Sequence, residues 1–348
     1  GRIVESIHFG AAAVMDASGN LVASWGDPDV VTFMRSSAKP FQALPFIERG
    51  GDEVYRLTPR EIALICASHS GTDEHAAVVK GIQEKAGVSE KDLLCGVHRP
   101  FHEATASAME CRGEAFNPNR HNCSGKHTGM LAHARMRGLP LEEYISMDHP
   151  VQQSILSTFA EMCGLAVEEV VVGVDGCSAP NFAVPLRSAA LAYARLMDPT
   201  ALPPARAAAC RKISAAMTGS PDMVGGPGRF DTVLMAFASG RVLAKAGAEG
   251  YQGLGLREGA LGPGSPALGV AFKIADGDMA GRANPRVALE ILRQLGAISE
   301  KEARSFDGFG PGPIYNWRHL QVGEIRTAFE LRRAPAPAKS GGQGESGT

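Results

Sequence analysis

The sequence has almost no excess of charge, few aromatic residues and no long apolar run. Its 348 residues carry 35 Lys and Arg against 37 Asp and Glu, which leaves a formal net charge of -2. Because binding to phosphates needs a basic excess, this balance argues against a nucleic-acid or membrane-surface role. No uncharged apolar run approaches the roughly 18 residues that span a bilayer, and the start Gly1-Arg2-Ile3-Val4-Glu5 lacks a signal-peptide pattern. We therefore expect a cytoplasmic protein.

The cysteines lack the paired C-x-x-C spacing of a strong zinc motif and the even count of a disulfide scaffold. Seven cysteines are spread along the chain, which fits a reduced compartment better. Five lie among apolar or helical residues and are predicted to be buried as small hydrophobic side chains: Cys66, Cys95, Cys111, Cys163 and Cys210. The other two, Cys123 and Cys177, lie in polar, glycine-containing loops.

Composition and length are those of an ordinary globular protein. Apolar residues make up 44% and charged residues 21%, so the body of the chain has enough apolar side chains for a full core. Strand patterns near both ends and helical patterns between them predict an α+β domain, in which a mixed antiparallel sheet joins N- and C-terminal segments. We expect one domain over residues 1–331, in one or two lobes, and a disordered Ala/Pro- and Gly/Ser-rich tail over 332–348.

Residue periodicity places the individual elements. Strands are predicted at 2–9, 11–15, 21–25, 170–174, 268–274 and 323–331, with a hairpin in which 233–238 pairs with 242–246. Helices are predicted at 39–49, 59–66, 73–86, 125–137, 151–162, 183–196 and 203–217.

The first candidate for chemistry is the run Arg35-Ser36-Ser37-Ala38-Lys39-Pro40. Ser36 and Lys39 are three residues apart, so on a helix they share a face. Proline is tolerated only in the first helical turn, so Pro40 places Ser36 at or beside the N-cap, where the helix dipole favours a developing negative charge. A serine hydroxyl becomes a good nucleophile beside an amine of lowered pKa. The pattern predicts a serine-lysine reaction centre; the plain alternative is that Ser36 caps a helix and Lys39 is solvated.

Two further motifs follow in the order that serine-lysine enzymes use. Ser68 lies in Ser-His-Ser-Gly after an apolar helix, and Lys245 lies in Lys-Ala-Gly at the end of a late strand. Penicillin-binding enzymes carry S-x-x-K, then S-D-N, then K-T-G, so the match is by role and order rather than by letter. Together the motifs predict two pairs that face one pocket, Ser36 with Lys39 and Ser68 with Lys245.

The two loop cysteines form a third candidate site. Lys126 follows Cys123 by three residues and His127 lies beside it, while Cys177 follows Asp175-Gly176. Thiolates and nitrogen ligands are what zinc prefers, although lysine is an uncommon ligand. From spacing alone, a zinc site, a disulfide between Cys123 and Cys177, catalytic thiols and simple burial all stay open.

Seven strings that span most of the chain carry a family resemblance: 35–40 (RSSAKP), 66–71 (CASHSG), 95–100 (CGVHRP), 122–127 (NCSGKH), 174–180 (VDGCSAP), 228–232 (GRFDT) and 245–250 (KAGAEG). This set resembles the Rhizobium etli-type inducible L-asparaginases. The resemblance implies hydrolysis of L-asparagine to L-aspartate and ammonia, a fold similar to serine β-lactamases and penicillin-binding proteins, and a homodimer.

The resemblance also implies roles for individual residues. It implies that Zn²⁺ is bound by Cys123, Lys126 and Cys177, and that the two serine-lysine pairs named above are catalytic. It places Asp175 against the substrate, with Arg35 and His127 near the pocket.

We expect Ser36 to attack the side-chain amide of asparagine while Lys39 takes its proton, with Ser68 and Lys245 relaying the proton or stabilising the anion. Asp175 would pair with the substrate's ammonium group, and the zinc would orient substrate or organise loops rather than supply a hydroxide. Two alternatives remain. One is another serine amidase or a penicillin-recognising enzyme; the other is a catalytically silent, zinc-dependent binding protein.

Overall fold

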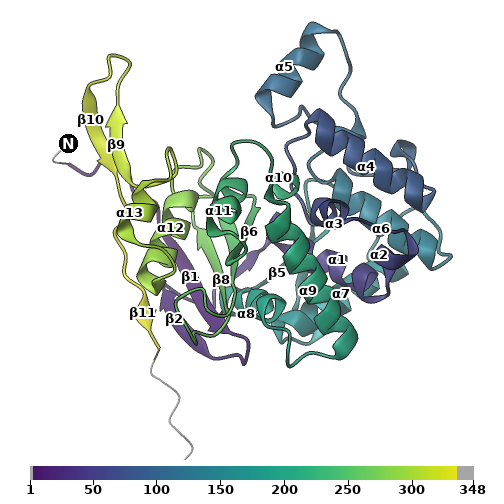
Figure 1. The fold of residues 1–348 in the computed structure, drawn as a ribbon, viewed down its shortest axis with the longest axis horizontal. Helices are drawn as coiled ribbons and strands as arrows, with labels where there is room; N and C mark the ends of the chain where they lie inside the picture. Colours follow the sequence, from purple (N-terminus) through teal and green to yellow (C-terminus); the bar gives the residue numbers. More distant parts are fainter. Residues whose placement is uncertain (1–2, 335–348) are drawn as a thin grey trace, which may run out of the picture.

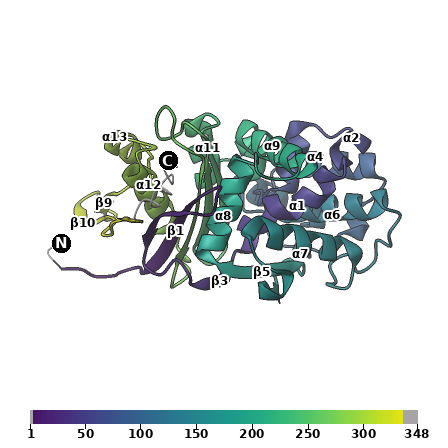
Figure 2. The same ribbon diagram turned by 90° about the horizontal axis from the view of Figure 1, so that it is seen from below.

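A six-stranded antiparallel sheet forms one part of the molecule, and a helical layer forms the other (Figures 1 and 2). The computed structural model describes residues 3–334. The strand order is β11-β2-β1-β8-β7-β6. The strands are β1 (Gly10–Asp16), β2 (Leu21–Trp25), β6 (Val242–Gly247), β7 (Tyr251–Leu256), β8 (Leu268–Ile274) and β11 (Arg332–Arg333). Because β1 pairs along its whole length with β8, the sheet joins N- and C-terminal segments, and the predicted α+β class is confirmed.

Helices cover both faces of this sheet (Figure 2). Helix α8 (Leu186–Met197) packs on the face toward the helical layer, and α11 (Phe230–Ala238), α12 (Asn284–Leu295) and α13 (Glu300–Arg304) lie on the other side. The approach of α8 is unusually close because the strand residues beneath it are small. A Cβ atom on Gly269 of β8 would lie 1.9 Å from the backbone oxygen of Ala190.

The helical layer surrounds α1 (Lys39–Glu48), which is buried from Lys39 through Ile47. A helix that is apolar on all sides has to be enclosed by others. Its neighbours are α6, α7 and α9. The further helices of the layer and its extensions are α2 (Gly51–Val54), α3 (Pro59–Ile65), α4 (Asp73–Ala86), α5 (Glu103–Cys111), α6 (Ser124–Met136), α7 (Pro150–Cys163), α9 (Pro204–Gly219) and α10 (Pro221–Val224). Short 3-10 turns lie at Arg35–Ala38, Glu90–Asp92, Pro118–Arg120 and Val167–Glu169.

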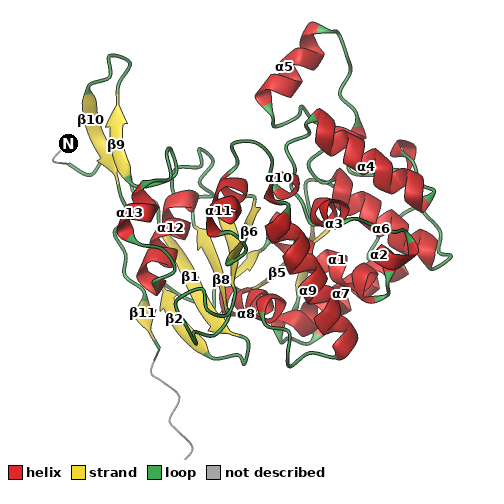
Figure 3. Cartoon of the chain, in the orientation of Figure 1, coloured by secondary structure: helices red, strands yellow, loops and turns green. Residues whose placement is uncertain are grey.

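Two small sheets complete the fold (Figure 3). In the first, β5 (Pro180–Pro185) lies between β3 (Val31–Phe33) and β4 (Val171–Val174). Because β3 leads directly to the turn with Ser36, and β4 and β5 bracket the loop with Asp175 and Cys177, this sheet brings the two motifs together. The second sheet is the projecting hairpin of β9 (Gly312–Tyr315) and β10 (Gln321–Ile325).

Several predicted elements are wrong. Residues 3–9 form no strand, and the predicted strand 323–331 ends at Ile325. Residues 233–238 belong to helix α11, whose buried side chains recur at helical spacing, so the actual hairpin joins β6 to β7. The predicted helix 183–196 begins only at Leu186, because 180–185 pair with strands on both sides.

Three smaller points concern the ends of the chain and the cysteines. Cys111 is exposed, whereas the other four cysteines predicted to be buried are buried. Of the predicted tail 332–348, Arg332–Arg333 pair with β2 as β11, and 335–348 lie outside the described residues. No helix within residues 3–334 is long and apolar enough to cross a membrane.

The tight packing of α8 on β8 predicts that Gly269→Ala destabilises the fold by more than about 2 kcal/mol, because the added methyl group meets backbone that cannot rotate away. Gly219→Ala is the matched control. A Cβ there meets nothing within 4 Å, so the free energy of unfolding should stay equal or rise by up to about 1 kcal/mol. Urea denaturation of both variants measures the difference, and equal stabilities would contradict the packing argument.

Candidate active site

Two buried lysine amines converge on one serine oxygen. Lys39 Nζ donates a hydrogen bond to Ser68 Oγ at 2.9 Å, and Lys245 Nζ donates to the same atom at 3.0 Å. Lys39 begins α1, Ser68 follows α3, and Lys245 lies on the edge strand β6, so helical layer and sheet meet here. Both lysines are 1% exposed and Ser68 is 7% exposed. The predicted Ser68–Lys245 pair is therefore formed, and Lys39 joins it.

The predicted contact between Ser36 and Lys39 is different. Lys39 donates to Ser68, to the backbone oxygen of Ala67 and to that of Asn122, and Ser36 Oγ forms no hydrogen bond with any residue in 3–334. Ser36 is partly exposed and sits in the 3-10 turn before α1, whose N-cap is Ala38 rather than Ser36. The three-residue spacing predicts that Ser36 lies near the Lys39 amine. In the structure, the amine donates instead to Ser68, a serine from another part of the chain.

The turn that carries Ser36 is firmly anchored. Arg35 has φ 51, in the left-handed region that costs energy for a residue with a side chain. Its backbone N–H donates to Asn181 Oδ1 at 3.1 Å. The buried Ser37 hydroxyl donates to the backbone oxygen of Lys245 at 2.6 Å, and Tyr193 donates to the backbone oxygen of Ser37 at 2.7 Å. These bonds keep Ser36 partly exposed at the site, while its neighbour Ser37 is buried and hydrogen-bonded.

Lys245 is the amine most strongly shifted toward neutrality. Burial is the main cause that lowers its pKa to about 7, and the positive charges of Lys39 and Arg229 act in the same direction. The carboxylate of Asp231 opposes them. Asp231 accepts hydrogen bonds from the backbone N–H of Ala246 at 2.7 Å and from Gln252 at 3.0 Å. Sequence reasoning assigned no role to Asp231, although the string GRFDT contains it.

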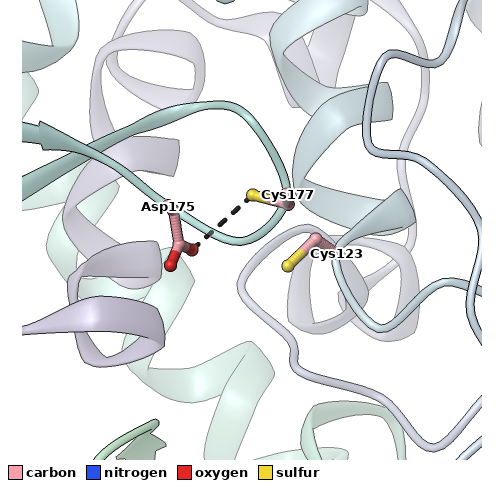
Figure 4. A group of neighbouring side chains, drawn as sticks. All are labelled: Cys123, Asp175 and Cys177. Atoms are coloured by element: carbon pink, nitrogen blue, oxygen red, sulfur yellow. Dashed lines mark hydrogen bonds between the residues drawn. The ribbon is translucent and has the colours of Figure 1, made fainter.

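A second cluster brings together Cys123, Asp175 and Cys177 (Figure 4). The two cysteine sulfurs and one carboxylate oxygen of Asp175 lie within 4.8 Å of one another. Cys177 Sγ donates to Asp175 Oδ2 at 3.6 Å, and Lys126 Nζ donates to Cys177 Sγ at 3.0 Å. Both cysteines are free thiols, so the alternative of a disulfide between them is not what the structure shows. The three predicted metal ligands thus meet, with Asp175 as an additional neighbour.

The charges within this cluster compensate one another. A hydrogen bond with Cys177 lowers the pKa of Cys123 well below its ordinary value, and the same bond raises the pKa of Cys177. Burial alone would lower the pKa of Lys126, but the nearby Cys177, Cys123 and Asp175 outweigh it and raise that pKa. One thiolate beside one ammonium group is therefore the favoured state of the two cysteines and the lysine.

Arg35 and Asp175, both predicted to lie near the substrate, are joined to each other. Arg35 Nε donates to Asp175 Oδ1 at 2.7 Å. Burial acts to raise the pKa of Asp175, but Lys126 and Arg35 together lower it, so the carboxyl stays ionised. A further carboxylate, that of Glu249, lies 4.0 Å from Arg35 Nη1. Glu249 comes from the β6–β7 turn, and sequence reasoning assigned it no role, although the string KAGAEG contains it.

His127 is deeply buried behind the cysteines. Its Nδ1 shares a hydrogen bond of 2.6 Å with the hydroxyl of Tyr144. Burial is the main cause that lowers its pKa to about 4, so the ring is neutral at pH 7. Tyr144 was not singled out in the sequence, because a lone tyrosine in a loop carries no motif.

The two clusters touch through one residue. The backbone oxygen of Asn122 accepts from Lys39 Nζ at 3.3 Å, and Asn122 precedes Cys123 directly in the chain. A surface hollow of about 730 Å³ lies elsewhere, at Pro45, Arg137 and Pro150, and none of the predicted site residues lines it.

The lowered pKa of Lys245 makes the stability of the fold depend on pH. Between about 7 and the ordinary value of 10.5, this lysine is neutral in the folded protein and protonated in the unfolded chain. Unfolding then takes up a proton, so the free energy of unfolding rises with pH, by about 1.4 kcal/mol per pH unit at most. We expect Lys245→Met to reduce the rise between pH 6.5 and 9. Urea denaturation at pH 6.5 and at pH 9 checks this. A pH dependence that Lys245→Met leaves unchanged would show that Lys245 is still charged in the folded protein at pH 9.

The model of a family described as L-asparaginase II matches residues 1–327. The chain belongs to the L-asparaginase II family. Membership of this family supports the prediction that the protein is an amidohydrolase that acts on a small amide substrate. A search of curated proteins gave no match.

Among solved structures, this L-asparaginase II-family chain has matches at low similarity. A glutaminase of Bacillus subtilis, in covalent complex with 5-oxo-L-norleucine, is 14% identical with a TM-score of 0.35, covering 76% of this chain and 79% of that one. The native form of Mglu is 15% identical with a TM-score of 0.35, covering 86% of this chain and 65% of that one.

Proposed function

We propose that the protein is an L-asparaginase of the serine-lysine type, which hydrolyses L-asparagine to L-aspartate and ammonia. The observation that carries the proposal is the serine hydroxyl of Ser68 held between the amines of Lys39 and Lys245, in a chain of the L-asparaginase II family. Two buried amines on one hydroxyl form a proton-transfer network, which a binding protein would not need.

Ser36 is the proposed nucleophile. Its hydroxyl is partly exposed, forms no hydrogen bond with residues 3–334, and follows a residue held in a strained conformation. Strain of this kind is typical of functional positions. Ser36 Oγ attacks the side-chain carbonyl carbon of asparagine and loses its proton to Lys39, one turn away. Lys39 can accept this proton after it has passed one of its own through Ser68 to the neutral Lys245, so that Lys39 is the uncharged amine at the moment of attack. The tetrahedral intermediate then expels ammonia and leaves an aspartyl ester on Ser36, which water hydrolyses.

Ser68 is the proposed proton donor to the leaving ammonia. A hydroxyl has two acceptor lone pairs and one proton. Both lone pairs of Ser68 receive an amine, so its own proton is directed elsewhere. Ser68 gives that proton to the departing nitrogen and regains one from a neighbouring lysine. A pKa of about 7 lets Lys245 change its protonation state at neutral pH at little cost.

The arrangement of these groups supports a likeness to serine β-lactamases and penicillin-binding proteins. The first serine-lysine motif opens the buried helix α1 of the helical layer, and the late lysine lies on strand β6 at one edge of an antiparallel sheet. The order S-x-x-K, Ser68, Lys245 is the order of the three motifs in those enzymes. A homodimer and a cytoplasmic location stay predictions.

Substrate recognition is proposed to begin at Asp175. Its carboxylate is ionised and one of its oxygens is engaged by Arg35. The other oxygen can face the ammonium group of an amino acid. Arg35 then holds the carboxylate in place, and the neutral His127 lies next to Lys126 in the chain, hydrogen-bonded to Tyr144.

The residues present fit the implied zinc ion. Two buried cysteine sulfurs, one of them with a strongly lowered pKa, converge with a buried amine, which is a donor set that Zn²⁺ accepts. Cys123, Lys126 and Cys177 would hold the ion. When bound, it would supply positive charge that orients the substrate and fixes the loops of Cys123 and Cys177. The serine chemistry above uses none of the metal's own ligands.

The nucleophile assignment predicts that Ser36→Ala reduces kcat for ammonia release from L-asparagine by at least about 10³-fold, because the variant lacks the hydroxyl that forms the ester in this mechanism. Ser18→Ala, in the exposed turn between β1 and β2, is the control and should keep wild-type turnover. Glutamine and a β-lactam panel tested in parallel define the substrate. Near-normal turnover by Ser36→Ala would remove Ser36 from the mechanism, and acylation by a β-lactam without asparagine hydrolysis would favour a penicillin-recognising enzyme.

The metal assignment predicts that the purified protein carries about one zinc per chain, and that Cys123→Ser and Cys177→Ser each lose most of it, because serine is a poor zinc ligand. The exposed Cys111→Ser is the control and should retain the metal. Elemental analysis after dialysis measures the content. A wild-type protein that binds no added zinc would exclude the ion while leaving the serine-lysine proposal intact.

A further inference from the structure

Three loops are tied together beside Ser68. The backbone N–H of Ser68 donates to the backbone oxygen of Val224 at 3.0 Å, and Ser70 Oγ donates to that of Gly225 at 2.7 Å. On the other side, the backbone N–H of His102 donates to the backbone oxygen of Ser70 at 2.9 Å. The segments that end in Arg229 and that contain Phe101 are therefore fixed to the reaction centre, although the mechanism above uses neither.

The segment Gly225–Arg229 approaches so closely because its first residues have no side chain. Gly226 has φ +113, and a Cβ there would lie 2.8 Å from Ser70 Oγ. The segment then enters helix α11, with Arg229 as the residue that precedes it. Two residues further on, Asp231 binds the backbone N–H of Ala246, next to Lys245. Arg229 is thus anchored on both sides to the groups that carry the proposed chemistry.

Arg229 has no acidic partner in the part of the chain that the structure describes. Its guanidinium carbon lies 5.7 Å from the centre of the Phe101 ring, a cation-π contact. Within residues 3–334 its side chain forms neither a salt bridge nor a hydrogen bond. The positive charge of Arg229 still acts on the site, because it helps to lower the pKa of Lys245. Its effect on that pKa is smaller than those of burial, Asp231 and Lys39. By contrast, the guanidinium group of Arg35 is paired with the carboxylate of Asp175.

The substrate proposed above has three polar groups, and the site residues assigned so far account for two. The side-chain amide meets Ser36 and the ammonium group meets Asp175, but the α-carboxylate has no cation. A guanidinium group matches a carboxylate with two parallel hydrogen bonds, and a ring beneath it holds the plane of the group in place. Arg229 offers such a guanidinium group, held over the Phe101 ring and without an acidic partner among residues 3–334.

We propose that Arg229 binds the α-carboxylate of the substrate and makes the enzyme specific for a free amino acid over peptides and esters of asparagine. The inference rests on the proposed function and goes beyond it, since it defines which asparagine derivatives the site accepts. Phe101 is a positioning residue in this arrangement, because its ring contacts the guanidinium and not the substrate.

The test compares ammonia release from L-asparagine and from its α-methyl ester, whose α-carboxyl group is uncharged. We expect wild type to prefer L-asparagine, and Arg229→Ala to lose about 10- to 100-fold in kcat/KM for L-asparagine, mainly through KM. The ester should change less than about threefold, so the preference disappears. Arg229→Lys should keep part of it. Arg318→Ala, an exposed arginine on the β9–β10 hairpin, is the matched control and should behave as wild type.

The outcomes separate this inference from the proposed function. An equal loss for both substrates in Arg229→Ala would mean a structural role, and a preserved preference would overturn the inference directly. Should wild type hydrolyse neither compound, the asparaginase proposal is wrong, and calorimetric binding of the same two compounds still decides about Arg229. Loss of the preference for the free carboxylate in Arg229→Ala would then support it, and its retention would refute it.

Discussion

Two amines that share one hydroxyl oxygen are the constraint on which the site depends. Lys39 and Lys245 cannot both be charged at this distance in a buried position without a large electrostatic cost. The fold resolves the conflict by burying Lys245, which lowers its pKa to about 7. Asp231 limits the effect, because its carboxylate favours the charged amine. The position of strand β6 relative to helix α1 therefore sets the proton affinity of the centre.

In the cysteine cluster the neighbouring groups also shift the pKa of a buried lysine, but they raise it rather than lower it. There Lys126 lies beside thiols and a carboxylate rather than beside another amine, and its pKa is raised. Three buried lysines within one region thus fall into two electrostatic environments, and the backbone of Asn122 and Cys123 separates them. Such neighbouring sites with opposite perturbations are typical of functional centres.

Sequence reasoning predicted the members of the site better than their contacts. Spacing placed Lys39 one turn from Ser36, but which hydroxyl the amine contacts depends on α3, which delivers Ser68 from 29 residues away. The cysteine motifs predicted the cluster of Cys123 and Cys177, whereas Tyr144 carries no local signal at all. The apolar run at 233–238 was read as a strand because both periodicities fit short apolar stretches, and only packing against β6 selects the helix.

The pairing of β1 with β8 also has a consequence for the order in which the protein becomes active. The two strands are separated by about 250 residues of chain, so the sheet closes late and has a high contact order. During synthesis, α1, α3 and the cysteine loops emerge long before β6. A nascent chain can therefore assemble the helical layer with Ser36, Lys39 and Ser68, yet it lacks the second amine until the C-terminal half is made. Completion of the sheet is therefore also the step that places the second amine beside Ser68.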